Sequence, residues 1–128
     1  MLGERKAKQI TDSILARSTA DQTEVVVLVN DQYLTRFANS TIHQNVAEVD
    51  NEVRIRVVLG GPEAGKRIGV AVTNDLEEEA LARTLESALT IARHQPENPG
   101  FRSLPGPAPI PDVALFDEGT AGCSPEAR

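Results

Sequence analysis

The stretch that decides the fold runs from residue 53 to residue 92 and reads VRIRVVLGGPEAGKRIGVAVTNDLEEEALARTLESALTIA. Its first part alternates apolar residues with Arg54 and Arg56, which is the period of a half-buried β-strand. A glycine-rich loop at residues 60–65 leads to a second alternating segment at residues 68–73. One face of that segment carries only small residues, namely Gly69, Ala71 and Thr73. Because small side chains let another backbone approach closely, we expect a helix or a strand to pack there.

A helix is expected from about Leu76. Either Asn74 or Asp75 can cap it, and Glu77 or Glu78 follows three positions later in the register of a capping box. The run of glutamates also suits the positive end of the helix dipole. One stripe of this helix should be buried, and it consists of Leu81, Leu85, Ala88, Leu89 and Ala92.

The N-terminal half predicts one helix and three strands. Apolar residues recur at helical spacing over residues 4–18. A continuous β-branched run at residues 24–29 predicts a strand buried on both faces, residues 33–37 predict a return strand, and the more polar residues 42–49 predict a strand near an edge. Turns are expected at Asn30-Asp31, Asn39-Ser40 and Asp50-Asn51. The fold class is therefore α+β, with two layers: an antiparallel-rich sheet of about five strands and two helices on one face, over residues 1–95.

The remaining residues, 96–128, differ in composition. Seven of the eight prolines lie there, and the run PGPAPIP at residues 105–111 favours an extended polyproline conformation. We expect a linker, or the start of a further region. Ser124-Pro125-Glu126 has the pattern of a helix N-terminus, so we expect the chain to be a fragment of a longer protein.

Composition excludes several classes of function. The 13 basic and 19 acidic residues give a net charge of −6, which argues against sequence-independent DNA binding, because such binding depends on basic side chains. The single cysteine cannot form an internal disulfide. The first residues lack an apolar signal-peptide core, and no apolar run is long enough to span a membrane. We expect a cytoplasmic location, with no membrane contact.

Residues that could carry catalysis or bind metal are scattered. His43 and His94 lie far apart and belong to no zinc-binding spacing. The loop around Lys66 lacks the phosphate-loop pattern, and Cys123 has no base beside it in the sequence. The chain is therefore expected to contain no catalytic residue and no metal ligand.

Four residues are candidates for contact with a peptide or a partner. Arg54 and Arg56 share one face of a strand, where they either form ion pairs with Glu48 or Glu52 or bind a carboxylate of another molecule. His43 and Asn45 lie on the polar strand at residues 42–49. If that strand is at an edge, it can accept an extended peptide by strand addition.

The order of these motifs resembles the N-terminal domain of the TldD/PmbA family, whose members are also labelled modulators of DNA gyrase. The resemblance lies in the run RFANSTIHQNVAEVDNEVRIRVVLG at residues 36–60 and in KRIGVAVTNDLEEEALARTLESALTIARHQPENPGF at residues 66–101. Phe116-Asp117 before Ser124-Pro125-Glu126 also fits, so the resemblance covers nearly the whole chain.

The resemblance implies a division of labour. TldD-like members carry an HExxxH helix in a C-terminal region, where two histidines and a cysteine bind zinc for peptide hydrolysis. PmbA-like members lack that motif and pair with the catalytic subunit. None of those ligands is present here, and Cys123 is not the zinc cysteine. The implied function is that of a non-catalytic N-terminal domain, without a cofactor of its own, which pairs in a homo- or heterodimer with a TldD/PmbA-type subunit and helps to form a chamber for peptide substrates.

The residues also permit a stand-alone interaction module that regulates a partner and has no protease activity. The reading frame beyond Arg128 separates the two hypotheses. An HExxxH helix downstream indicates a catalytic parent, a continuation without it indicates a PmbA-like parent, and a stop codon indicates a stand-alone module. Direct action on DNA gains no support from the acidic composition.

Overall fold

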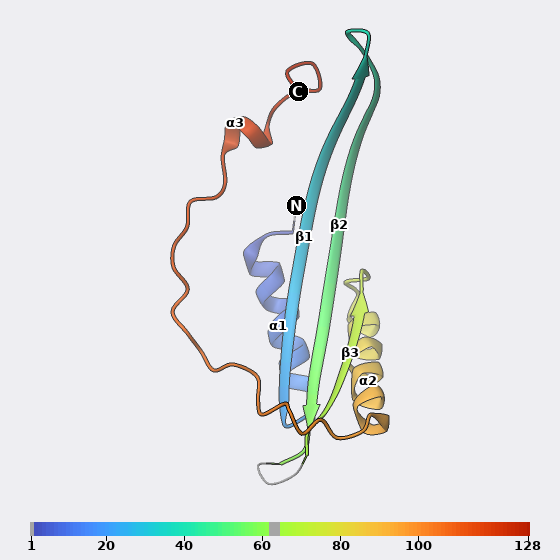
Figure 1. Cartoon of the computed structure of the whole chain (residues 1–128), viewed down its shortest axis with the longest axis vertical. Helices are drawn as coiled ribbons and strands as arrows, with labels where there is room; N and C mark the ends of the chain where they lie inside the picture. The colour runs from blue at the N-terminus through green and yellow to red at the C-terminus, as the bar shows by residue number, and fades with distance from the viewer. Residues whose placement is uncertain (1, 62–64) are drawn as a thin grey trace. The chain divides into compact units, whose positions relative to one another are not determined.

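The computed structural model describes residues 2–61 and 65–128 (Figure 1). The elements follow the order α1 (Glu4–Arg17), β1 (Gln22–Ala38), β2 (Thr41–Leu59), β3 (Arg67–Thr73), α2 (Glu78–His94) and α3 (Glu118–Ala121). The three strands form one sheet in the order β1-β2-β3. The chain divides into two compact units. The first comprises Met1–Val29 and Asp50–Pro105, and the second comprises Asn30–Val49 and Gly106–Arg128.

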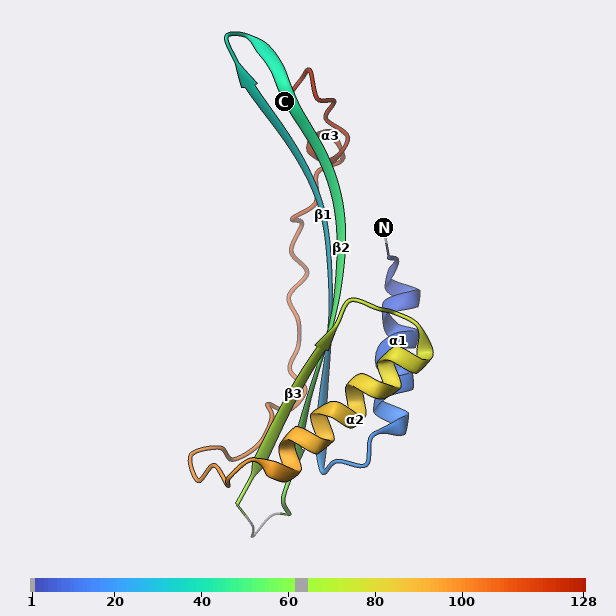
Figure 2. The same ribbon diagram turned by 90° about the vertical axis from the view of Figure 1, so that its right-hand side faces the viewer.

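The hydrophobic core of the first unit lies between one face of the sheet and the two long helices (Figure 2). Helix α1 contributes Ile10 and Ile14 because these two residues are four apart and share one face of the helix. Strand β2 contributes every second residue. The strand side of the core consists of Val53, Ile55 and Val57, and the α2 side consists of Leu81, Leu85, Ala88, Leu89 and Ala92. The α+β class and the buried stripe of α2 are confirmed.

Strand β3 pairs antiparallel with β2, from Val53 opposite Thr73 to Leu59 opposite Arg67. The small-residue face of β3 does face a helix, as the sequence predicts. A Cβ atom added to Gly69 would overlap the carbonyl oxygen of Ala88 and would lie 2.6 Å from the backbone nitrogen of Ala92. The absence of a side chain at this position therefore sets how closely α2 approaches the sheet.

Helix α2 begins later than predicted, and the capping box is wrong. The N-cap residue is Glu77, and no side chain caps the helix there. Asp75 instead accepts a hydrogen bond from the Glu77 N–H at 2.9 Å, and its own N–H donates to the Thr73 hydroxyl at 3.1 Å. These local bonds compete with helix formation, so the chain turns before α2 begins at Glu78.

The prediction of about five strands is wrong, because the described residues form a sheet of three. Strand β1 continues through Asn30-Asp31, and β2 continues through Asp50-Asn51. Pairing of β1 with β2 supplies the extended backbone with hydrogen bonds at both points, and this outweighs the weak turn preference of Asn and Asp. Only Asn39-Ser40 forms a turn, with positive φ angles of 48° and 58°, as a two-residue hairpin requires.

One burial prediction also needs correction. The run at residues 24–29 is not buried on both faces: residues 24–27 are half-buried and Leu28 is 47% exposed. β1 is at the edge of the sheet, and the helices cover only one face. The strand at residues 42–49 belongs to the central strand, β2. However, β3 pairs only with Val53–Leu59, so within the described residues the segment 42–49 has β1 as its single neighbour.

The second unit combines the outer part of the β1–β2 hairpin with the C-terminal tail. Its only helix in the described residues is the short α3, which Asp117 caps by accepting a hydrogen bond from the Thr120 N–H at 2.6 Å. Among the helices of residues 2–61 and 65–128, none has the length and apolar character that crossing a bilayer requires. The domain boundary expected at residue 95 stays a prediction.

Candidate interaction surfaces

The first candidate surface is the sheet face that the helices leave uncovered in the first unit. Residues of β2 and β3 alternate across it, because Arg54 lies opposite Val72 and Arg56 lies opposite Val70. Val70 is 41% exposed and Val72 is 51% exposed. Since neighbouring residues of a strand point to opposite faces, Leu28 of β1 also belongs to this surface. We call it the open face.

The two arginines of the open face are held in ion pairs. Nη2 of Arg54 lies 2.7 Å from Oε1 of Glu52, and Nη2 of Arg56 lies 2.6 Å from Oε2 of Glu24. The pairing with Glu52 is one that the sequence predicts. The pairing with Glu24 was missed, because it joins residues on different strands. The open face thus combines exposed apolar side chains with two arginines that are paired to glutamates, while Val58 on the same face is fully buried.

The second candidate surface is the outer part of the hairpin, Asn30–Val49, which we call the hairpin arm. Large apolar side chains are exposed along it: Tyr33 at 49%, Phe37 at 66%, Ile42 at 41% and Val49 at 57%. Exposed apolar side chains that gather on one surface mark sites of interaction with other molecules, and Phe37 and Ile42 of this arm line a common pocket. The sequence predicts two short, separate strands here, so it does not predict that these side chains belong to one continuous arm.

His43 and Asn45 belong to the hairpin arm, whereas Arg54 and Arg56 belong to the first unit. Asn45 is held in place, because its Oδ1 accepts hydrogen bonds from the Thr35 hydroxyl at 3.1 Å and from Arg128 at 3.2 Å. His43 is exposed, and its side chain makes no hydrogen bond or ion pair with any of the described residues. The four candidates therefore divide into two pairs, one in each unit.

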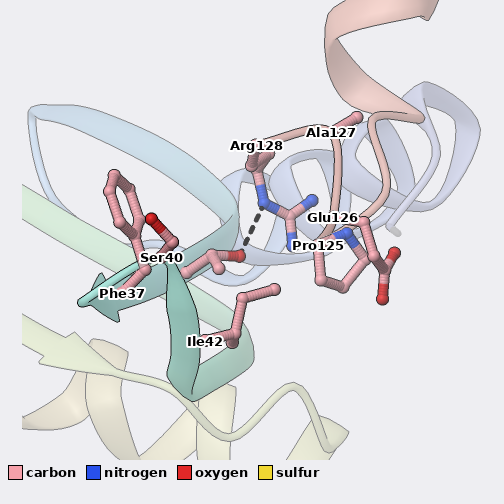
Figure 3. Close-up of a pocket in the computed structure, with 8 residues that line it drawn as sticks. Phe37, Ser40, Ile42, Pro125, Glu126, Ala127 and Arg128 are labelled. Carbon is pink, nitrogen blue, oxygen red and sulfur yellow. Dashed lines mark hydrogen bonds between the residues drawn. The ribbon is translucent and has the colours of Figure 1, made fainter.

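The end of the tail contacts the hairpin arm within the second unit (Figure 3). Nε of Arg128 donates a hydrogen bond to the Thr35 hydroxyl at 3.2 Å, and the guanidinium lies 5.7 Å from the centroid of the Tyr33 ring. A pocket of about 350 Å³ opens beside these contacts. It is lined by Thr35, Phe37, Ser40, Ile42 and residues 125–128.

The pattern Ser124-Pro125-Glu126 forms one turn of the expected kind. The Ser124 carbonyl accepts hydrogen bonds from the N–H groups of Ala127 and Arg128, at 3.1 and 3.0 Å. Hydrogen bonds from the backbone N–H of Glu126 and from the Ser124 hydroxyl hold the pKa of the Glu126 carboxyl below its ordinary value. Backbone and hydroxyl hydrogen bonds from Thr120 lower the pKa of Asp117 in the same way.

The described residues do not present the donor set of a metal site. No group of three His, Cys, Asp or Glu side chains comes together within residues 2–61 and 65–128. Cys123 is half-buried in the tail. The described residues therefore offer two candidate interaction surfaces, and a pocket lies at the end of the hairpin arm.

The sheet, the two helices on one of its faces and the hairpin arm define a small α+β domain whose surfaces suit contact with other chains. The sequence model described as PmbA/TldA metallopeptidase domain 1 matches residues 23–92. This match covers more than half of the chain, so the chain belongs to the TldD/PmbA family and contains its N-terminal domain. The expected family is confirmed.

A solved structure supports the fold. The crystal structure of TldE from Thermococcus kodakarensis matches with a TM-score of 0.70 and 17% sequence identity. The match covers 95% of this chain but only 24% of the TldE chain. The chain thus spans about a quarter of the length of that structure. No curated protein sequence matches significantly.

Proposed function

We propose that this chain is the non-catalytic N-terminal domain of a TldD/PmbA-type zinc metallopeptidase or of its partner subunit. Its role is to pair with a homologous subunit and to form part of the wall around a peptide substrate. Membership of the family supports this role. The described residues do not fit a zinc ion, so any hydrolytic step belongs to another region or another chain. The cytoplasmic location stays a prediction.

The observation that carries the proposal is the free edge of β2 along residues 42–49. β3 pairs with β2 only from Val53 onward. Along residues 42–49, the backbone groups of β2 that point away from β1 therefore have no strand partner among the described residues. An extended peptide can use such groups as an added strand, with main-chain hydrogen bonds providing affinity and side-chain contacts providing selectivity. The exposed side chains of Tyr33 and Phe37 offer apolar contacts nearby on the same arm.

A peptide titration followed by NMR tests this role. Unfolded peptides added to the 15N-labelled chain should shift the amide signals of residues 42–49 in a saturable manner. The amides of α2 are the internal control and should not move. If the signals of residues 42–49 stay unmoved up to millimolar peptide, the arm does not bind peptides by strand addition.

The stand-alone module remains the competing hypothesis, and the encoded sequence beyond Arg128 separates the two. A continuation that includes an HExxxH helix supports a catalytic parent, and a continuation without that helix supports a PmbA-like partner. A stop codon at that point contradicts both and leaves the regulatory module.

A further inference from the structure

We propose that the outer edge of β1 at Thr23–Val29 is the seam through which two copies of this chain pair, as antiparallel strands related by a two-fold axis. The inference rests on the proposed pairing role and deepens it by naming the surface and the partner. It follows from two features of this segment: its apolar composition, and its position at the edge of the sheet.

The segment TEVVVLV has the composition of an interior strand. It holds five consecutive branched aliphatic residues, and Glu24 is its only charged residue. Such continuous apolar runs are typical of strands with neighbours on both sides. Here the strand is at the edge of the sheet, and residues 23–27 are only half-buried. Val25 and Val27 pack against the core of their own copy, so Val26 and Leu28, which lie on the open face, are the residues that one copy leaves incompletely buried.

Ordinary protection against edge pairing is missing from this segment. Natural edge strands avoid association through lysines, prolines, bulges or short length. Strand β1 is 17 residues long, and Thr23–Val29 contains neither lysine nor proline. Outside the sheet itself, none of the backbone hydrogen bonds among the described residues involves residues 23–29. The outer row of backbone groups is thus free to pair with another strand.

The opposite edge of the sheet is less suited to pairing. Strand β3 is only 7 residues long, and the chain after α2 returns to its start, where the Asn98 N–H donates to the Lys66 carbonyl at 2.7 Å. Short length and partial cover are two of the usual protections of an edge. Because β3 is shorter and partly covered, the edge of β1 is the better candidate for pairing.

Charge and side-chain pattern favour a second copy over an unrelated peptide. Antiparallel pairing of Val25–Leu28 with itself places aliphatic residues opposite aliphatic residues on both faces, which is a favourable cross-strand arrangement. The only acid, Glu24, is neutralised within its own copy by Arg56 at 2.6 Å. Two copies can therefore approach without repulsion between like charges along the seam.

A cysteine scan tests the seam in the full chain. In a two-fold antiparallel pair, one residue of the strand must lie opposite its own copy, at a Cα separation that permits a disulfide. Cys123 is the only native cysteine, so single cysteines are placed at positions 25 to 28 in a Cys123→Ser background. We expect mild oxidation to cross-link one of these positions at least tenfold faster than its two neighbours. Val72→Cys on β3 is the matched control and should form no cross-link under the same oxidation.

Solution mass measurements give a second readout that does not depend on cross-linking. Sedimentation equilibrium should show a monomer–dimer equilibrium, and Leu28→Lys should raise its dissociation constant at least tenfold. Val72→Lys is the matched control, because Val72 lies on the same open face with a similar exposure of 51% against 47% for Leu28. Circular dichroism confirms that each variant remains folded.

The following outcomes would each contradict pairing through β1. A wild-type chain that stays monomeric up to about 0.5 mM has no such pairing, and equal effects of Leu28→Lys and Val72→Lys place the interface on the open face instead. Binding of a synthetic peptide at β1 by a monomeric chain contradicts self-pairing. A dimer that fails the cysteine scan leaves the pairing role standing without this seam. Peptide binding at residues 42–49 is measured separately, so that part of the proposed function can stand or fail by itself.

Discussion

Gly69 in β3 lies directly against the backbone of α2 at Ala88, at a point where no Cβ atom fits. We expect Gly69→Ala to lower the free energy of unfolding by about 1–3 kcal/mol, because the helix must move away from the sheet to admit the methyl group. Urea unfolding measures the change. Gly106→Ala is the control, since a Cβ there meets nothing within 4 Å. Equal midpoints for the two variants would contradict the close packing.

The two faces of β2 differ in their contribution to stability. Ile55 is fully buried under the helices, whereas Arg54 projects from the open face. Ile55→Ala should lower the free energy of unfolding by about 2–5 kcal/mol through lost burial and the cavity that remains. Arg54→Ala should change it by less than about 1 kcal/mol, because exposed ion pairs contribute little. Urea unfolding of both variants decides whether the helices cover the face assigned to them.

The Glu24–Arg56 pair should behave differently from the exposed pairs. Both side chains are about two-thirds buried, and Nε of Arg56 is buried without a hydrogen-bond partner. Removing the carboxylate alone leaves a poorly solvated cation, so Glu24→Gln should cost more stability than the double variant Glu24→Gln/Arg56→Met. A double-mutant cycle measures the coupling. Lys8–Asp12, with both side chains mostly exposed, should show a coupling near zero.

Arg128 should hold the end of the tail in place through Tyr33, Thr35 and Asn45. Asn45→Ala and Tyr33→Leu each remove one contact, and a cation–π contact at an exposed site is worth about 0.5–1 kcal/mol. We therefore expect lower heteronuclear NOE values at residues 127 and 128 in both variants. His43→Ala lies on the same strand and lacks these contacts, so it should leave the tail unchanged. A similar change in all three variants would rule out a specific hold.

Acid should release α3. The pKa of Asp117 is lowered in the folded tail by the hydrogen bonds from Thr120, so the contribution of this cap is fully present above the ordinary aspartate pKa of about 3.9. The contribution is lost as the pH falls through the lowered pKa. Carbon chemical shifts of residues 119–121, followed by NMR during acidification, measure the change. Asp117→Asn keeps an acceptor without a titrating proton, and its shifts should stay flat over the same range.

Local patterns predicted much of the fold. The period of two in residues 53–59, the small-residue face of β3 and the apolar stripes of both helices depend only on neighbours in the sequence, and each is present in the structure. The number of strands could not be predicted in this way. Whether Asn30-Asp31 and Asp50-Asn51 turn or stay extended depends on the pairing of β1 with β2, and turn propensity alone does not include that pairing.

The candidate site shows the same division. The spacing of Arg54 and Arg56 predicts that they share one face of a strand, and the Glu52 partner of Arg54 lies close in the sequence. The contact of Glu24 with Arg56 and the contact of Arg128 with Tyr33 and Asn45 join residues that are distant in the sequence. Sequence periodicity does not predict such contacts, because they depend on the register of the strands and on where the tail packs against the hairpin arm.

The sequence by itself determined the class of the domain, its family and the stripes that form its core, since these follow from residue order and short-range periodicity. Only the tertiary structure decided that β1 is an edge strand and that the helices leave one face open. It also decided that, within the described residues, the hairpin arm has no third strand beside it. The physical reason is that backbone groups and apolar surfaces gain partners or stay free according to which segments meet in space. The two surfaces proposed for binding depend on those free groups.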